Sequence, residues 1–167
     1  LVLACTRTSG GAGEGPVGAR LDALVQEANL RIHERSVSDD DLAGMGTTLT
    51  LLHVGADELT LVHVGDSRGY RLRDGVLERI TTDHTLVEEL VRQGRLTPEE
   101  ADEHPQRSII TRALGPEAGV QADTVTIPAR DGDVYLLCSD GLTDMVPEAR
   151  VAELLSAAPD LTTAARD

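Results

Sequence analysis

Two short apolar runs that each stop at an aspartate place the strongest constraint on how this chain can fold. The run at 134–138 is short, almost wholly apolar and partly β-branched or aromatic, which predicts a buried strand. It is followed by a Ser-Asp-Gly-Leu tetrad at 139–142, and a second apolar run at 59–64 is followed by Gly-Asp-Ser-Arg at 65–68. Asp66 and Asp140 are therefore predicted to lie at strand ends, where the chain turns.

Carboxylates held at rigid strand ends can bind a hard cation, because Mg²⁺ and Mn²⁺ prefer oxygen ligands. Asp144 follows Asp140 by four residues and is close enough along the chain to add a third oxygen ligand. The same residues also have an ordinary structural explanation, since Asp bonds its own backbone in turns and Gly accepts a positive φ. On spacing alone, turn chemistry is favoured over a metal site.

The composition narrows the function without identifying it. The chain has 167 residues, enough for one domain, and its two Tyr, no Phe and no Trp predict a core of Leu, Val, Ile and Ala. A formal net charge of −14 argues against nucleic acid and against an anionic membrane surface, which both need clustered positive charge. It also opposes the binding of bare phosphate, so an acidic protein that acts on phosphate is expected to carry a metal.

No apolar stretch approaches the ~18 residues of a membrane-spanning helix, so we expect no membrane insertion. The cysteines Cys5 and Cys138 are far apart in the sequence and suggest no disulfide framework. We therefore expect a cytoplasmic protein.

The periodicity of apolar residues predicts an α+β domain. Apolar residues at 21, 24, 25, 28 and 32 form one stripe, which predicts a helix over about 17–35. Four runs with high β propensity follow and predict an antiparallel meander, with an Asp-Gly hairpin turn at 74–75. These runs are 47–52, 58–64, 69–73 and 76–80. Helical sequence follows, with a stop at Gly94 and a capping box at Thr97. Strands at 120–127 and 134–138 and a helix at 147–157 complete the chain. Because regular βαβ alternation is absent, antiparallel sheet is expected to pack against helices.

Five short segments of this chain occur together, in the same order, in one known family. They are Gly-Met-Gly-Thr-Thr at 44–48, Val-Gly-Asp-Ser-Arg at 64–68, Thr-Asp-His at 82–84, His-Pro-Gln-Arg at 104–107 and the tetrad at 139–142. Together they resemble the bacterial branch of the metal-dependent serine/threonine protein phosphatases of type 2C. The resemblance covers roughly residues 17–158, and five segments in order are far more specific than any one of them.

The resemblance implies a four-layer α-β-β-α sandwich of two antiparallel sheets flanked by helices. It also implies a pair of Mn²⁺ or Mg²⁺ ions bridging a water that attacks phosphoserine or phosphothreonine in proteins, so that no protein nucleophile is required. Asp140 matches a ligand of the metal cluster, and Asp66 and Asp144 match positions that hold an additional metal with it. Residues 84–107 match a flap beside the active site that is linked to substrate choice. No side chain is assigned a catalytic role, and His84 and His104 are expected to be structural.

The implied partners are phosphorylated proteins, among them a serine/threonine kinase and its substrates. The chain departs from the family pattern at both ends. Cys5-Thr6-Arg7-Thr8 stands where the family has the Asp-Gly that bridges the two metals, the phosphate-binding Arg is absent, and the chain stops at Asp167 before a Gly-Gly-x-Asp-Asn segment. Three explanations compete: a fragment of a full phosphatase, a decayed gene product, or a pseudophosphatase. We expect one partial phosphatase domain over 1–167, truncated or degenerate at both ends.

Three functional hypotheses follow from the sequence. The first is metal-dependent hydrolysis of phosphoserine and phosphothreonine on proteins. The second is a catalytically dead pseudophosphatase that acts as a protein-binding module on the same fold. The third is an acidic α+β domain whose aspartates only shape turns.

Overall fold

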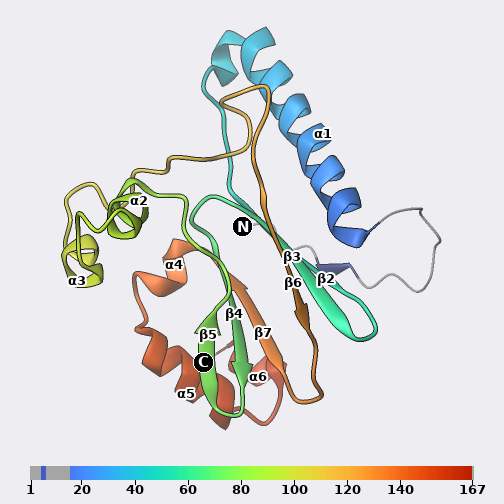
Figure 1. Ribbon diagram of the computed structural model, residues 1–167, viewed down its shortest axis with the longest axis vertical. Coiled ribbons are helices and arrows are strands. Elements are labelled where there is room, and N and C mark those ends of the chain that lie inside the picture. The colour runs from blue at the N-terminus through green and yellow to red at the C-terminus, as the bar shows by residue number, and fades with distance from the viewer. Residues whose placement is uncertain (1–4, 7–15, 167) are drawn as a thin grey trace.

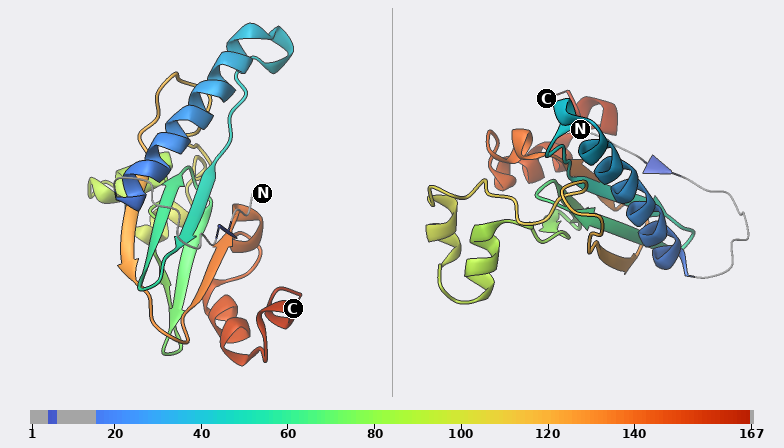
Figure 2. Two further views of the ribbon diagram at one scale, coloured as in Figure 1. Left: turned by 90° about the vertical axis from the view of Figure 1, so that its right-hand side faces the viewer. Right: turned by 90° about the horizontal axis from the view of Figure 1, so that it is seen from above.

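Two β-sheets form the middle of the fold, and helices cover their outer faces (Figures 1 and 2). The computed structural model describes residues 5–6 and 16–166. The long helix α1 (Val17–Ser38) contacts strands β3 and β6 of the first sheet, and α5 (Glu148–Ala157) contacts β4 and β5 of the second. This order of helix, sheet, sheet and helix is the four-layer α-β-β-α sandwich that the family resemblance implies.

The first sheet has the strand order β1-β2-β3-β6 and the second has β5-β4-β7. All neighbours are antiparallel except β1, which pairs parallel to β2. The prediction of two antiparallel sheets is therefore confirmed for every strand but β1. The bounds are β1 Cys5–Thr6, β2 Leu49–Val54, β3 Glu58–Val64, β4 Arg68–Arg73, β5 Val76–Arg79, β6 Asp123–Pro128 and β7 Val134–Cys138.

Shorter helices connect the sheets and close the chain. Two of them, α2 and α3, lie in the segment 84–107, which we call the flap and which projects from the side of the sandwich (Figure 1). Among the described residues, no helix is long and apolar enough to cross a membrane. The remaining bounds are η1 Asp40–Leu42, α2 Leu86–Arg92, α3 Pro98–Asp102, α4 Asp140–Thr143 and α6 Leu161–Ala164.

Strand β3 is buried on both faces, because its alternating side chains enter two different cores. Leu59 and Leu61 pack between the two sheets, with Leu52 of β2 and partly buried residues of β7. Val62 and Val64 point to the other face and pack against α1. Since successive side chains of a strand point to opposite faces, one apolar strand supplies both interfaces of the sandwich.

The predicted helix at 17–35 is confirmed as α1, but two residues of its predicted apolar stripe, Leu24 and Ala28, are exposed. Leu24 is 60 % exposed, whereas Leu21 and Val25 are buried against the sheet. The buried line continues through Asn29, whose amide Nδ2 donates to the Glu117 carbonyl at 3.0 Å and whose Oδ1 accepts from the Gly115 N–H at 2.8 Å. These bonds compensate for the burial of a polar side chain on an otherwise apolar face.

The predicted strand at 134–138 is confirmed as β7, but its predicted burial is wrong. Only Cys138 is buried, and the other four residues are half-buried. The reason is that β7 pairs only with β4 and forms an edge of its sheet among the described residues. Arg7 and Thr8, which belong to the segment where the sequence departs from the family pattern, lie outside the described residues.

Local turn and cap signals are confirmed where the sequence predicted them. The hairpin between β4 and β5 turns at Asp74 and Gly75, both with positive φ (52° and 78°), as a tight two-residue hairpin requires. Thr97 forms the predicted capping box with Glu100 at the start of α3. Gly94 follows α2 with φ 68°, the left-handed conformation that commonly ends a helix.

Candidate functional site

A cavity of about 610 Å³ lies between one end of the second sheet and the flap. Its walls come from the β3–β4 turn, β4, β5, the flap, α4 and the start of α5. All three predicted metal ligands line it, together with side chains that the sequence did not single out. The lining residues are Asp66, Arg68, Arg79, Asp83, Thr85, Val87, Glu88, Val91, Pro98, Ala101, Asp102, Arg107, Ser108, Asp140, Thr143, Asp144 and Glu148.

Asp66 lies in the turn by which the chain leaves the first sheet and enters the second. Gly65 precedes it with φ 111°, and a Cβ atom there would lie 2.3 Å from the Thr48 side chain, so only glycine fits. The turn is braced by the Thr48 hydroxyl, which is hydrogen bonded to the Ser67 hydroxyl at 2.9 Å. The Asp66 carboxylate is therefore carried by a constrained turn at the edge of the cavity.

The pairing of β4 with β7 explains why Asp66 and Asp140 lie near one another. The antiparallel register places Arg68 opposite Cys138. Extending that register by two residues beyond the strands sets position 66 opposite position 140. Burial raises the pKa of Asp66, and the negative charge of Asp140 raises it further. Both carboxylates also line a second cavity of about 260 Å³, which is shared with hydroxyl groups such as those of Ser67 and Ser139.

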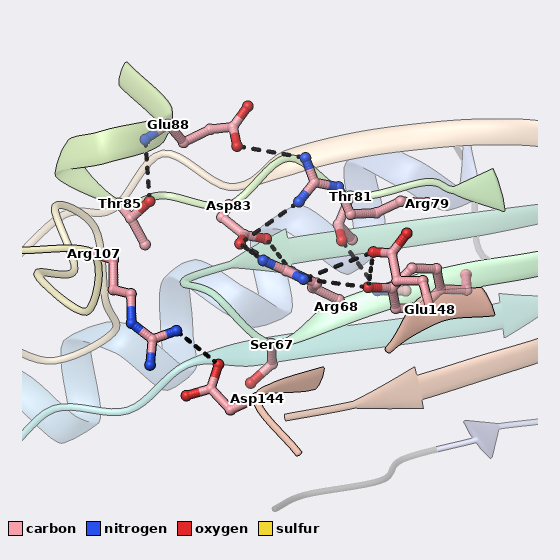
Figure 3. Close-up of polar contacts among 12 residues, drawn as sticks. Ser67, Arg68, Arg79, Thr81, Asp83, Thr85, Glu88, Arg107, Asp144 and Glu148 are labelled. Atoms are coloured by element: carbon pink, nitrogen blue, oxygen red, sulfur yellow. Dashed lines mark hydrogen bonds and ion pairs between the residues drawn. The ribbon is translucent and has the colours of Figure 1, made fainter. Parts of the chain in front are cut away.

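Asp144 lies at the end of α4, where its backbone N–H donates to the Asp140 carbonyl at 2.8 Å. Its carboxylate accepts a 3.4 Å hydrogen bond from Arg107, and both side chains are about half exposed (Figure 3). The structure thus brings Asp66 and Asp140 together, while Asp144 shares the cavity but pairs with an arginine of the flap.

The carboxylates that line the cavity are the candidate ligands for the metal site that the family resemblance implies. Asp66 and Asp140 fit a divalent cation, because two neighbouring carboxylates repel one another and are stabilised by a positive charge between them. Among the described residues, however, no group of three or more His, Cys, Asp and Glu side chains is arranged to hold a metal ion. The part of the chain that the structure describes therefore supplies a pair of candidate ligands rather than a complete set.

A buried ion pair, which the sequence did not reveal, fixes the base of the cavity. Arg68 donates from Nε and Nη2 to the carboxylate of Asp83, with Nη2 to Oδ2 at 2.7 Å (Figure 3). Side-chain exposure is 26 % for Arg68 and 8 % for Asp83, so the pair is largely removed from solvent. The two residues belong to two of the five family segments, but nothing in the sequence indicated that they pair.

Arg79 and Glu148 extend this ion pair to the neighbouring helices. Arg79 lies 3.8 Å from Asp83 and 3.4 Å from Glu88 on α2. Tyr70 donates its hydroxyl to Glu148 of α5 at 2.8 Å, and burial together with this bond raises the pKa of Tyr70 to about 12. The network therefore joins the second sheet to both the flap and α5 (Figure 3).

His84 supports the turn that carries Asp66. Its Nδ1 accepts the Gly65 N–H at 3.0 Å, and its Nε2 lies 2.9 Å from Arg112 Nη1 and 3.2 Å from an oxygen of Asp123. The sequence expectation that His84 is structural agrees with these contacts. His104 similarly accepts the Gln106 N–H, at 3.1 Å, within the flap.

His63 is the other buried imidazole near the turn. Burial and the neighbouring His84 lower its pKa to about 4, so its ring is neutral at physiological pH. Thr50 donates its hydroxyl to the Ser67 carbonyl at 2.6 Å, so the His63 Nδ1–H donates to the Thr50 oxygen at 3.0 Å. The Nε2 atom is buried and has no hydrogen-bond partner among the described residues.

Comparison with known proteins identifies the class to which this sandwich and cavity belong. The protein phosphatase 2C family model matches residues 6–164. The chain therefore belongs to the protein phosphatase 2C family, as the five sequence segments indicated.

Individual relatives agree with this assignment. The chain is 52 % identical over 142 residues to the serine/threonine protein phosphatase PstP of Mycobacterium tuberculosis, covering 84 % of this chain and 27 % of the relative. A crystal structure of the M. tuberculosis phosphatase PstP/Ppp superimposes with a TM-score of 0.86 at 48 % identity, covering 92 % of this chain and 64 % of that one. The catalytic domain of PstP, solved in complex with two manganese ions, superimposes with a TM-score of 0.82 at 44 % identity, covering 93 % and 64 %.

The chain thus spans about a quarter of the length of its mycobacterial relative and less than two thirds of the solved chains.

Proposed function

We propose that this chain contributes to a metal-dependent protein phosphatase that hydrolyses phosphoserine and phosphothreonine. The observation that carries the proposal is the pair Asp66 and Asp140, facing one cavity at the paired ends of β4 and β7, in a chain of the protein phosphatase 2C family. Members of this family are metal-dependent, and the related PstP domain was solved with two manganese ions. We extend this to the present chain and expect Mn²⁺ or Mg²⁺.

In this proposal Asp66 and Asp140 would hold the cation, and Asp144 would be a third ligand if its ion pair with Arg107 opened. A bound divalent cation would supply an activated water and offset the negative charge of the phosphoryl group. Among the described arginines of the cavity, Arg107 is best placed to donate to a phosphoryl oxygen, because it is about half exposed and its guanidinium pairs with the half-exposed Asp144. The other two arginines of the cavity are bound to Asp83 and Glu88.

The proposed partners are phosphorylated proteins, and the activity would oppose a serine/threonine kinase in the cytoplasm. We treat residues 1–167 as one partial phosphatase domain. Support comes from the family match over 6–164 and from the similarity to proteins named serine/threonine phosphatases.

Two measurements test the proposal. Hydrolysis of p-nitrophenyl phosphate and of a phosphothreonine peptide is measured with added Mn²⁺ and with a chelator, and Mn²⁺ binding is measured by calorimetry. We expect metal-dependent turnover and binding that are both lost in Asp140→Asn. Asp131→Asn is the matched control, because Asp131 is exposed in the turn before β7, at the opposite end of the sheet.

A folded protein that binds Mn²⁺ but hydrolyses neither compound would overturn the enzymatic proposal and favour the pseudophosphatase. If the protein binds no Mn²⁺ and Asp140→Asn changes neither binding nor turnover, the remaining hypothesis is that the aspartates only shape turns.

A further inference from the structure

The flap presents a wall of mixed character to the cavity. Four apolar side chains form its centre, and two of them, Val87 and Ala101, are buried. Val87 and Val91 lie one turn apart on α2, so they form one face of that helix. We call the cavity-lining residues of α2 and α3 the flap wall; Thr85 and Arg107 of the flap also line the cavity but lie outside these two helices. The residues of the flap wall are Val87, Val91, Pro98, Ala101, Glu88 and Asp102.

An apolar surface bordered by carboxylates matches the shape and chemistry of an arginine or lysine side chain. The aliphatic stem of such a residue packs on apolar groups while its cationic head reaches an acid. Glu88 of α2 and Asp102 of α3 border the wall on two different helices. A phosphate group or an acidic side chain would be repelled from the same wall.

The charge balance of the cavity favours a cation as well. Among the described residues, seven carboxylates and three arginines line it. Each arginine is already paired with a carboxylate: Arg68 with Asp83, Arg79 with Glu88 and Arg107 with Asp144. Asp102 is exposed and forms no ion pair with any described residue, so its charge remains available to a ligand.

We propose that the flap wall binds a basic side chain of the substrate, so that the preferred substrates carry Arg or Lys close to the phosphorylated residue. This inference rests on the proposed phosphatase function and deepens it by naming the substrate class. The phosphoryl group is directed to the Asp66–Asp140 end of the cavity, and the neighbouring cation to Val87, Val91 and the carboxylates beside them.

Three phosphothreonine peptides of equal length test the proposal. The positions beside the phosphothreonine carry Arg in the first peptide and Glu in the third. In the second peptide they carry citrulline, which has nearly the same shape as Arg but no charge. Binding to the chelator-treated protein is followed by fluorescence anisotropy, and kcat/KM is measured with Mn²⁺. We expect the Arg peptide to bind about fivefold more tightly than the citrulline peptide and the Glu peptide to bind most weakly, with differences that shrink as salt is added.

A matched pair of variants separates a local contact from the overall charge of −14. Asp102→Asn removes a carboxylate from the wall, whereas Glu99→Gln removes one from the same helix outside the cavity. We expect Asp102→Asn to lower the preference for Arg over citrulline by about twofold and Glu99→Gln to leave it unchanged. An equal effect of both variants, or equal binding of the Arg and citrulline peptides, would overturn the proposal.

The experiments distinguish failure of the proposed phosphatase function from failure of the flap-wall proposal. A preference for Arg in binding, without any hydrolysis of p-nitrophenyl phosphate, would refute the enzyme and keep the wall assignment. Hydrolysis of all three peptides with equal kcat/KM would keep the enzyme and refute the wall.

Discussion

The strands β4 and β7 carry charged side chains at both ends, and the two ends are opposite in character. The register that sets position 66 opposite 140 also sets Arg73 opposite position 133. At the first end two carboxylates lie near one another and share a cavity. At the second end Asp133 meets an arginine, with Arg73 Nε to Oδ1 at 2.7 Å and Nη2 to Oδ2 at 2.6 Å.

The partners of Asp133 complete this contrast. Tyr135 donates its hydroxyl to Oδ2 at 2.8 Å and the Arg130 N–H donates to the same atom at 3.0 Å. The hydrogen bonds from Arg73, with those of Tyr135 and Arg130, hold the pKa of Asp133 well below its usual range, whereas burial and a like charge raise that of Asp66. At the Asp133 end the hydrogen bonds stabilise the charged carboxylate, whereas at the Asp66 end burial and the charge of Asp140 disfavour it, and a bound cation would stabilise it.

The largest expected effect comes from removing a charge at the cavity end. Asp66→Asn should weaken Mn²⁺ binding by more than about a hundredfold, since even the partners of metal ligands typically contribute 10–100-fold. In chelator the same variant should melt at an equal or higher temperature than the parent, because like-charge repulsion is removed. Calorimetric titration and thermal unfolding measure the two quantities. A variant that melts lower in chelator would contradict the comparison.

The next largest effect is expected for the ion pair between Asp133 and Arg73, at the end of β4 and β7 away from the cavity. Asp133→Asn removes the partner of Arg73, and the Asp133 side chain is only 3 % exposed. Because a charge that loses its buried partner is strongly destabilising, we expect the melting temperature to fall by roughly 5 °C or more. Thermal unfolding beside the exposed control Asp131→Asn measures this. Equal melting of the two variants would show that the Arg73 pair does not stabilise the fold.

The two ends should also respond to acid with opposite sign. Because the pKa of Asp133 is lowered by folding, its contribution is fully present above the usual aspartate pKa of about 4 and is lost as the pH falls through the lower folded value. The pKa of Asp66 is raised, so its contribution is present below about 4 and is lost as the pH rises through the folded value.

Denaturant unfolding of the metal-free protein from neutral pH into acid tests this difference. In Asp133→Asn the free energy of unfolding should fall less steeply as the pH is lowered into acid. In Asp66→Asn it should fall less steeply as the pH is raised from acid toward neutral. Identical pH profiles for both variants would remove the basis of the comparison.

The smallest effect is expected for Arg107→Gln. The pair of Arg107 with Asp144 is exposed on both sides, so the free energy of unfolding should change by less than about 0.5 kcal/mol. Asp144 would then be free, and the apparent affinity for Mn²⁺ should rise about twofold. Calorimetry of the variant measures this, and a loss of stability as large as that in Asp133→Asn would show that the flap pair is structural.

Most of the strands, helices and turns could be predicted because their signals are local. The apolar run of β3, the Asp-Gly turn at 74–75 and the capping box at Thr97 each occupy a few consecutive residues. The stripe of α1 was predicted less well at Leu24 and Ala28, and the burial of β7 was overestimated, because the burial of a side chain depends on what packs against its element.

Asp66 and Asp140 of the proposed metal site were predicted from the sequence, because each follows an apolar run. Sequence alone determined that Asp66 and Asp140 end two strands and that the five family segments occur in order. Only the tertiary structure decided that Asp144 pairs with Arg107, that Arg68 is occupied by Asp83, and that the flap wall faces the cavity. These contacts join residues far apart in the chain, and their energies depend on burial and register, which no local pattern of residues encodes.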